Sequence, residues 1–159
     1  MHQLIIATPE QIIPGCIRIH HDGESVLELD ILADSKPLMT LPNSAFEERL
    51  VDSFSTYFSN TAQHIMLPIK LQGSDFQIRV WRALQDIDAG SVMAYGDLAR
   101  RLNSSARAVG NACRRNPLPI IVPCHRVVAK NGIGGFAGTT QGQLIEQKRR
   151  LLAHEGVVL

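Results

Sequence analysis

The sequence predicts an α+β protein with a small β-rich N-terminal domain, built of antiparallel strands plus a helix, and a mostly helical C-terminal domain containing a helix-turn-helix. Short apolar runs between turn residues over 3–33 predict the strands, and apolar residues at helical spacing predict the helices that follow. The 159 residues are enough for one hydrophobic core or for two small packed units. We place the domains at 1–70 and 71–159.

The N-terminal domain begins with two or three predicted antiparallel strands. Leu4–Ile6 is followed by the turn signal Pro14-Gly15, and the alternating stretch Val26–Ile31 follows the turn at His21–Glu24. Asn43-Ser44 can then cap a helix, because its apolar residues recur at helical spacing. These apolar residues are Phe46, Leu50, Val51, Phe54 and Phe58.

The second half of the chain begins with an extended link over 67–71 and is then mostly helical. Ser74-Asp75 can cap a helix that stops near Ala89-Gly90. A final helix carries apolar residues over 144–152 and ends at Glu155-Gly156.

Between these helices lie two short ones joined by a polar turn, the pattern of a helix-turn-helix. The first covers Tyr95–Leu102, the turn is Asn103–Ser105, and the second runs over Ala106–Arg115. Small residues on the second helix would let its backbone approach a DNA groove, and its arginines would meet phosphates. An Ala-rich packing helix is the alternative. The residues expected on its exposed side are Ala106, Arg107, Ala108, Gly110, Ala112, Arg114 and Arg115.

The composition, with 45% hydrophobic and 19% charged residues, is that of an ordinary globular protein. No apolar run is long enough to cross a membrane, and the N-terminus lacks the pattern of a signal peptide, so we expect a cytoplasmic protein. Cys16, Cys113 and Cys124 form an odd set without a C-x-x-C pair. We therefore expect no disulfide framework, no metal and no cofactor.

Charge is divided unevenly along the chain. Residues 1–72 hold four Lys and Arg against nine Asp and Glu, a net charge of −5, whereas residues 73–159 hold twelve against six, a net charge of +6. A basic half of this kind is typical of nucleic-acid binding. A solvated basic surface is the alternative that charge alone leaves open.

One cysteine has chemically active neighbours. In the otherwise apolar, strand-like run Ile120–Val128, Cys124 is followed by His125 and Arg126. A buried cysteine is usually an inert small apolar residue, but imidazole and cationic groups favour the reactive thiolate. Adjacent side chains in a strand point to opposite faces. His125 therefore serves Cys124 only if the chain bends at Pro123 or a water bridges the two side chains.

The segment Gly132–Gly138 is a glycine-rich loop that carries Phe136. It does not connect a strand to a helix with a lysine, so it is not a phosphate-binding loop. It suits the wall or lid of a pocket, and a simple turn is the alternative.

Pro-Cys-His-Arg-Val at 123–127 resembles the signature of the O6-alkylguanine-DNA alkyltransferases, also called methylated-DNA–protein-cysteine methyltransferases. The resemblance covers about residues 74–156, and for the N-terminal part it implies only a β-rich, ribonuclease-H-like domain. The other matching blocks are Phe76-Gln77 with Val80-Trp81, Tyr95–Ala99, Ala106–Gly110, Asn116-Pro117 and Leu151–Gly156.

The resemblance implies a catalytic set. Cys124 would accept the alkyl group, and His125 would act as its base through a water molecule. Glu155 would orient the imidazole, and Asn116 would brace the hydrogen bonds of the site. Tyr95 would assist rotation of the nucleotide and donate a proton toward guanine N3.

The resemblance also implies double-stranded DNA as the partner, bound in the minor groove. Arg107 would occupy the space of the flipped-out nucleotide, because O6 is hidden inside a duplex. The expected DNA-binding residues are Tyr95, Gly96, Ala106, Arg107, Ala108, Gly110, Cys113, Arg114 and Lys130.

The substrate pocket implied by the resemblance contains Val127, Phe136, Ala137 and Lys148. The carbonyls of Cys124 and Val127 would bind the guanine amino group, and the Ala137 amide would meet O6.

The implied function is direct-reversal DNA repair by stoichiometric, irreversible transfer of an alkyl group from O6-alkylguanine, with O4-alkylthymine as a further substrate, to Cys124. The enzyme would act as a monomer, without a membrane or an obligate protein partner. A non-catalytic sensor of alkylated DNA is the alternative, although relatives that only bind damage replace the acceptor cysteine. A cysteine hydrolase would need a separate histidine and an oxyanion arrangement that the sequence does not offer.

Overall fold

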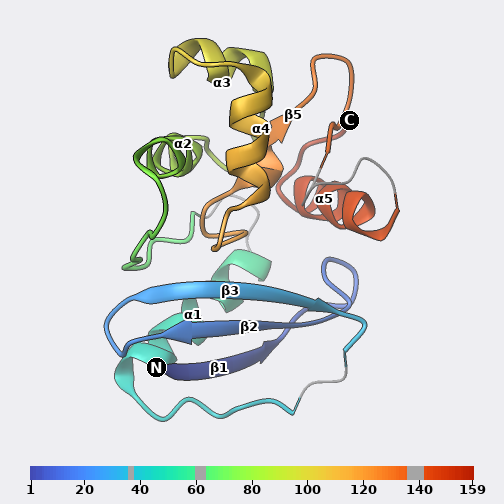
Figure 1. Ribbon diagram of the computed structural model, residues 1–159. Coiled ribbons are helices and arrows are strands. Elements are labelled where there is room, and N and C mark those ends of the chain that lie inside the picture. The colour runs from blue at the N-terminus through green and yellow to red at the C-terminus, as the bar shows by residue number, and fades with distance from the viewer. Residues whose placement is uncertain (36–37, 60–63, 136–141) are drawn as a thin grey trace.

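The computed structural model describes residues 1–35, 38–59, 64–135 and 142–159. Figure 1 shows a three-stranded sheet and one helix in the lower half of the view, with the remaining helices above them. In chain order the elements are β1 His2–Ala7, β2 Gly15–His21, β3 Val26–Ala33, α1 Ala45–Ser59, α2 Asp75–Gln85, β4 Met93–Ala94, α3 Tyr95–Arg101, α4 Ala106–Arg114, the 3₁₀ turn η1 Cys124–Arg126, β5 Val127–Val128 and α5 Gln143–His154. The predicted α+β class is confirmed. Within the described ranges, no helix has the length and apolar character that crossing a membrane requires.

The N-terminal sheet is antiparallel with the strand order β1-β2-β3, as predicted. Leu4 pairs with Ile19 across the sheet, and Ile17 lies on the same face of β2, so all three side chains are fully buried. Gly15 begins β2 with a φ of 134°, where a Cβ would collide with the carbonyl oxygen of Leu32. This turn therefore requires glycine.

Helix α1 completes the N-terminal part. Ser44 accepts a hydrogen bond from the Glu47 amide at 3.1 Å, which confirms the predicted cap. The helix buries Leu50, Phe54 and Tyr57, and these residues belong to the same apolar cluster as the inner face of the sheet.

The predicted extended link over 67–71 is attached to the sheet. The Val26 amide donates to the Pro68 carbonyl at 2.8 Å, and the Lys70 amide donates to the Val26 carbonyl at 3.0 Å. The link therefore runs along the start of β3 instead of passing freely from one domain to the next.

Helix α2 starts in a capping box, in which Ser74 and Gln77 exchange hydrogen bonds between side chain and backbone. It ends at Gln85, earlier than the predicted stop near Ala89-Gly90. The reason is a tight turn at its end, where the Ile87 amide bonds to the carbonyl three residues back.

Helices α3 and α4 are the two short helices expected before and after a polar turn. Asn103 in that turn has a positive φ of 55°, which asparagine tolerates better than most residues. Ser105 caps α4 by accepting a hydrogen bond from the Ala108 amide at 3.1 Å. Trp81 of α2 donates its indole N–H to the Ala112 carbonyl at 2.8 Å, which holds α4 against α2.

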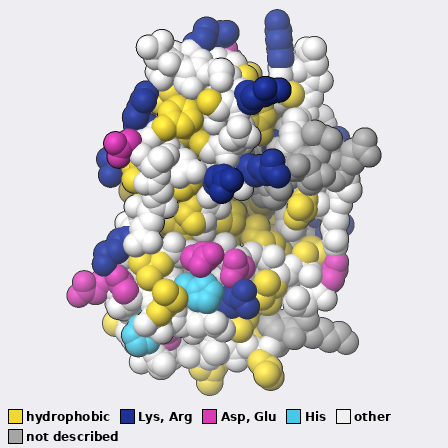
Figure 2. Space-filling view, in the orientation of Figure 1, with side chains coloured by type: hydrophobic (Ala, Val, Ile, Leu, Met, Phe, Trp, Pro, Cys, Tyr) yellow, Lys and Arg dark blue, Asp and Glu magenta, His cyan; other side chains and the backbone are white. Residues whose placement is uncertain are grey.

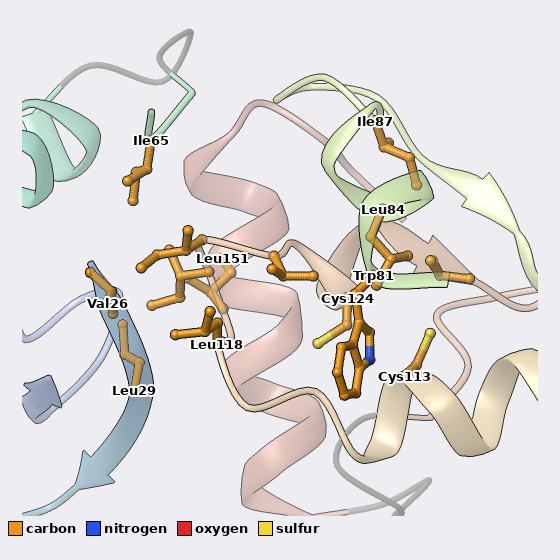
Figure 3. Packing of buried hydrophobic residues seen from close by; sticks show 14 of the residues in the cluster. Val26, Leu29, Ile65, Trp81, Leu84, Ile87, Cys113, Leu118, Cys124 and Leu151 are labelled. Atoms are coloured by element: carbon orange, nitrogen blue, oxygen red, sulfur yellow. The ribbon is translucent and has the colours of Figure 1, made fainter. Parts of the chain in front are cut away.

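One apolar core runs from the sheet into the C-terminal helices. Val26 and Leu29 on β3 face Leu118 and Leu151 (Figure 3), and all four side chains belong to the same buried cluster. The Leu29 amide also donates to the Pro117 carbonyl at 2.9 Å. A backbone hydrogen bond thus connects β3 to the segment that follows α4.

Candidate active site

Cys124 lies in a tight turn and not in a strand. Of the strand-like run predicted over 120–128, only Val127–Val128 form a strand, which pairs in parallel with β4. Ile120 has a positive φ of 74°, and η1 begins directly after Pro123. The strand prediction is therefore wrong for most of the run, whereas the bend expected at Pro123 is present.

His125, Arg126 and Glu155 form a buried network next to Cys124. Nε2 of His125 lies 2.6 Å from Oε1 of Glu155. The Arg126 guanidinium binds the same carboxylate, with Nε 3.0 Å from Oε2 and Nη2 2.9 Å from Oε1. All three residues are 3% exposed or less. An ion pair buried this deeply requires complete hydrogen bonding, and both oxygens of Glu155 have donors.

The charge states of this network follow from its surroundings. Burial alone would raise the pKa of Glu155, but the hydrogen bonds and charges of His125 and Arg126 outweigh it and hold the pKa at about 2. Burial lowers the pKa of His125, although Glu155 opposes this. His125 is therefore a neutral imidazole at neutral pH. Its Nδ1 is buried and has no hydrogen-bond partner in the described part of the chain, so this nitrogen is the one that can accept a proton.

Cys124 is 7% exposed, and burial raises the pKa of its thiol. A hydrogen bond from the Asn116 side chain and the positive charge of Lys148 both oppose this shift. Asn116 is itself held at both ends of its amide: Nδ2 donates to the Val122 carbonyl at 2.7 Å, and Oδ1 accepts from the Leu118 amide at 2.9 Å. Asn116 thus lies where a bracing residue would act on the thiol.

Lys148 and Tyr95 lie on another side of the site. The Lys148 ammonium donates to the carbonyl oxygens of Val127 at 2.6 Å and Gly135 at 2.8 Å, and it lies 5.7 Å from the centre of the Tyr95 ring. The Tyr95 hydroxyl donates to the Gly135 carbonyl at 3.2 Å. Burial lowers the pKa of Lys148 to about 8 and raises the pKa of Tyr95 above its usual range, so the phenol stays protonated.

A cavity of about 360 Å³ reaches Cys124 from the side of the sheet. Cys113, Asn116 and Pro119 line it on one side, and residues of β3 line it on the other. Its volume is that of a small-molecule site. Figure 2 shows hydrophobic side chains between a group of Lys and Arg residues above and a group of Asp, Glu and His residues below.

The surface of α4 differs from the expectation at Ala112. This residue is 3% exposed, because it lies on the same side of the helix as Val109 and its carbonyl accepts the Trp81 indole. The expectation that Ala112 is exposed is therefore wrong. Cys113, expected at the DNA, is 8% exposed and lines the cavity. The other α4 residues are placed as follows: Ala106, Arg107, Arg114 and the following Arg115 are exposed, and Ala108 and Gly110 are half-buried.

The remaining expected residues lie outside this helix. Gly96 is half-buried in the first turn of α3, and Lys130 is exposed in the turn after β5. Phe136 and Ala137, expected in the substrate pocket, lie outside the described residues.

Two contacts of the Glu155 carboxylate are not predicted from the sequence. Arg126 is expected there only as a cationic neighbour of Cys124, and its position beside His125 in an apolar run could have indicated a buried carboxylate partner. Tyr57 on α1 donates its hydroxyl to Oε1 of Glu155 at 3.2 Å. The two residues are separated by 98 positions, so no local pattern connects them.

The family model described as "6-O-methylguanine DNA methyltransferase, DNA binding domain" matches residues 75–157, more than half of the chain. The chain belongs to this family. The membership expected from the motif at 123–127 is confirmed, and the matched range contains His125, Arg126 and Glu155 but not Tyr57.

Relatives of this O6-methylguanine DNA methyltransferase family member extend the likeness to the N-terminal part. A methylated-DNA–protein-cysteine methyltransferase of Archaeoglobus fulgidus is 41% identical over 117 residues, which are 72% of this chain and 78% of the relative. One of Metallosphaera sedula is 37% identical over 146 residues, 91% of this chain and 89% of the relative. Among solved structures, Mycobacterium tuberculosis OGT in complex with DNA is similar with a TM-score of 0.80 at 31% identity, over 98% of this chain and 93% of that chain.

Proposed function

We propose that this family member repairs O6-alkylguanine in double-stranded DNA by transferring the alkyl group to the thiol of Cys124. The observation that carries the proposal is the buried imidazole of His125, next to the cysteine in η1. One ring nitrogen is 2.6 Å from the carboxylate of Glu155, and the other has no partner among the described residues. The names of the relatives from Archaeoglobus and Metallosphaera support the same reaction.

In the proposed reaction, the Cys124 thiol passes its proton through one water molecule to Nδ1 of His125. The sulfur then attacks the alkyl carbon, so that the S–C bond forms while the C–O6 bond breaks and its electron pair moves to guanine. Guanine takes a proton at N3 from the Tyr95 phenol. The proton that His125 took from the thiol then returns to the Tyr95 oxygen through water, so that guanine, Tyr95 and His125 all end neutral. Glu155 stabilises the transient imidazolium.

The surroundings of Cys124 favour the thiolate at the moment of transfer. Burial works against the charged sulfur, whereas the Asn116 hydrogen bond and the Lys148 charge work for it. The product is a thioether, which has no good leaving group. The alkyl group therefore stays on Cys124, and each molecule acts once.

Duplex DNA is the proposed partner, because the basic C-terminal half attracts phosphates. O6 is hidden inside a base pair, so the nucleotide must rotate out at a cost of about a few kcal/mol of stacking. Small residues at Ala106, Ala108 and Gly110 would let α4 lie in the minor groove. Arg107, exposed at the start of α4, would fill the space that the nucleotide leaves.

The stoichiometry of repair tests this function. We would mix the protein with an excess of a duplex containing O6-methylguanine and quantify restored guanine by chromatography of the digested DNA. We expect one guanine restored per protein chain and none with Cys124→Ser, whereas Cys16→Ala, which removes a buried thiol of β2, should still restore one. Binding of the duplex without restoration by the wild-type protein would instead favour a non-catalytic sensor.

A further inference from the structure

Tyr57 connects the N-terminal helix α1 to the carboxylate of Glu155, which binds His125. Its hydroxyl donates a 3.2 Å hydrogen bond to Oε1 of Glu155, the residue that follows the last residue of α5. Tyr57 is 1% exposed and lies outside the residues that match the family model. A residue from the N-terminal part thus touches the group that orients the proposed base.

The position of Tyr57 is fixed by further contacts between the ends of α1 and α5. Nε2 of His154 donates to the Tyr57 carbonyl at 2.7 Å, and the two rings meet edge-on with their centres 5.2 Å apart. Phe58 packs against both rings. The hydrogen bonds and the ring contacts together leave the phenol little freedom to move away from Glu155.

The oxygen that Tyr57 binds is shared with donors from two other residues. Oε1 of Glu155 also accepts from Nε2 of His125 at 2.6 Å and from Nη2 and Nε of Arg126 at 2.9 and 3.1 Å. A carboxylate oxygen has two lone pairs, so the donors of three residues compete for its electron density. Each donor reduces the attraction of the carboxylate for a positive charge on the imidazole. Tyr57 therefore moderates how strongly Glu155 favours the protonated form of His125.

The other charged groups around His125 are Arg126 and Lys148, and both disfavour a proton on the imidazole. Cys124 is its neighbour in the chain, and Glu155 is the group that favours the proton. Burial, followed by the charge of Glu155, raises the pKa of Tyr57 well above its usual range. The phenol therefore remains a neutral donor throughout the neutral pH range.

We infer that Tyr57 is a positioning residue for alkyl transfer: it fixes Glu155 and, through Glu155, sets the orientation and proton affinity of His125. The inference rests on the proposed function, because it assigns a role only if His125 is the base for Cys124. A hydrogen bond with a purely structural role would stabilise the contact between α1 and α5 and leave the base unaffected.

Tyr57→Phe removes the hydroxyl and keeps the ring. His125 can accept the thiol proton only when it is neutral, so the transfer rate falls as the pH drops through the pKa of His125. Loss of one donor to Glu155 raises that pKa. We therefore expect the low-pH limb of the single-turnover rate profile to move up by about 0.5 pH unit, the value of one modest hydrogen bond. The rate constant on the plateau should fall by about fivefold, because the carboxylate is held less firmly.

Two further measurements separate positioning from stability and from binding. Phe58→Leu weakens the ring packing between α1 and α5 but keeps the Tyr57 hydroxyl that binds Glu155. It should therefore lower the melting temperature and move the midpoint of the pH profile less than Tyr57→Phe does. In a Cys124→Ser background, which prevents reaction, Tyr57→Phe should bind the methylated duplex as tightly as the parent.

Three outcomes would overturn the inference: a wild-type pH profile and plateau rate in Tyr57→Phe, a midpoint that moves down, or an equal midpoint shift in Phe58→Leu. A different result would contradict the proposed function itself: the wild-type protein would transfer no alkyl group at all.

Discussion

The ammonium nitrogen of Lys148 lies 2.6 Å from the carbonyl oxygen of Val127, a group expected to bind the guanine amino group. The same nitrogen lies 2.8 Å from the Gly135 carbonyl. Lys148 therefore joins β5 to the glycine-rich loop and brings a positive charge into a buried site. Part of the Val127 carbonyl's hydrogen-bonding capacity is used by the protein itself, and one lone pair is left for a substrate.

Lys148→Met should remove a pH-dependent part of the protein's stability. Burial lowers the pKa of Lys148 from 10.5 to about 8. Below pH 8 the folded and unfolded chains both hold the proton, and the full cost of burying the charge is present. Between the two pKa values the unfolded chain binds more protons, so the free energy of unfolding of the wild-type protein should rise, by at most about 3 kcal/mol.

Denaturant unfolding of both proteins across this pH range checks the prediction, because groups that they share cancel in the difference. Arg149→Met, at the exposed neighbouring position, should keep the wild-type dependence. Identical pH dependence in Lys148→Met and the wild-type protein would show that Lys148 is not buried as a charge.

Arg107→Ala should separate repair in a duplex from reaction with a free base. Only the duplex requires a nucleotide to be rotated out, so repair of a methylated duplex should slow by about tenfold or more, whereas reaction with free O6-benzylguanine should change little. The measurement is the rate of each reaction under single-turnover conditions. Arg149→Ala removes the same charge from α5 and serves as the control. Equal losses for both substrates would exclude the proposed role of Arg107.

Asn116→Ala should make the Cys124 thiol less acidic. The Asn116 hydrogen bond favours the thiolate, and hydrogen bonds to charged groups are worth about 1.5 kcal/mol or more, which corresponds to roughly one pH unit. The rate at which iodoacetamide labels Cys124, followed by the mass of its peptide, should therefore reach half its maximum at higher pH. Asn111→Ala, on the exposed side of α4, should not shift it. An unchanged labelling profile in Asn116→Ala would mean that the amide does not reach the sulfur.

The N-terminal strands and most helices could be predicted because burial follows the period of the element. Leu4 and Ile17 lie on the inner face of a sheet whose strands alternate, and Ser74 and Ser105 are caps of ordinary type. The run over 120–128 carried no such period, because every one of its residues is buried. An apolar run without alternation does not distinguish a strand from an irregular buried segment.

In the candidate site, too, some residues could be predicted from the sequence and others could not. The motif identifies Cys124 and His125, because their residue types are the ones that nucleophilic chemistry needs. Tyr57 could not be found in the sequence, since its bond to Glu155 exists only once the end of α1 packs on the end of α5. Contacts between distant elements depend on the tertiary fold, which no local pattern encodes.

The central claim is that Cys124 receives the alkyl group, and its most direct test is to locate that group in the protein. After reaction with a duplex containing O6-methylguanine, the chain would be digested and the masses of the peptides with Cys16, Cys113 and Cys124 measured. We expect only the Cys124 peptide to gain the mass of a methyl group in place of one hydrogen, and no peptide of Cys124→Ser to gain it. A methyl group on Cys113 or Cys16, or on no peptide of a protein that has restored its DNA, would contradict the claim.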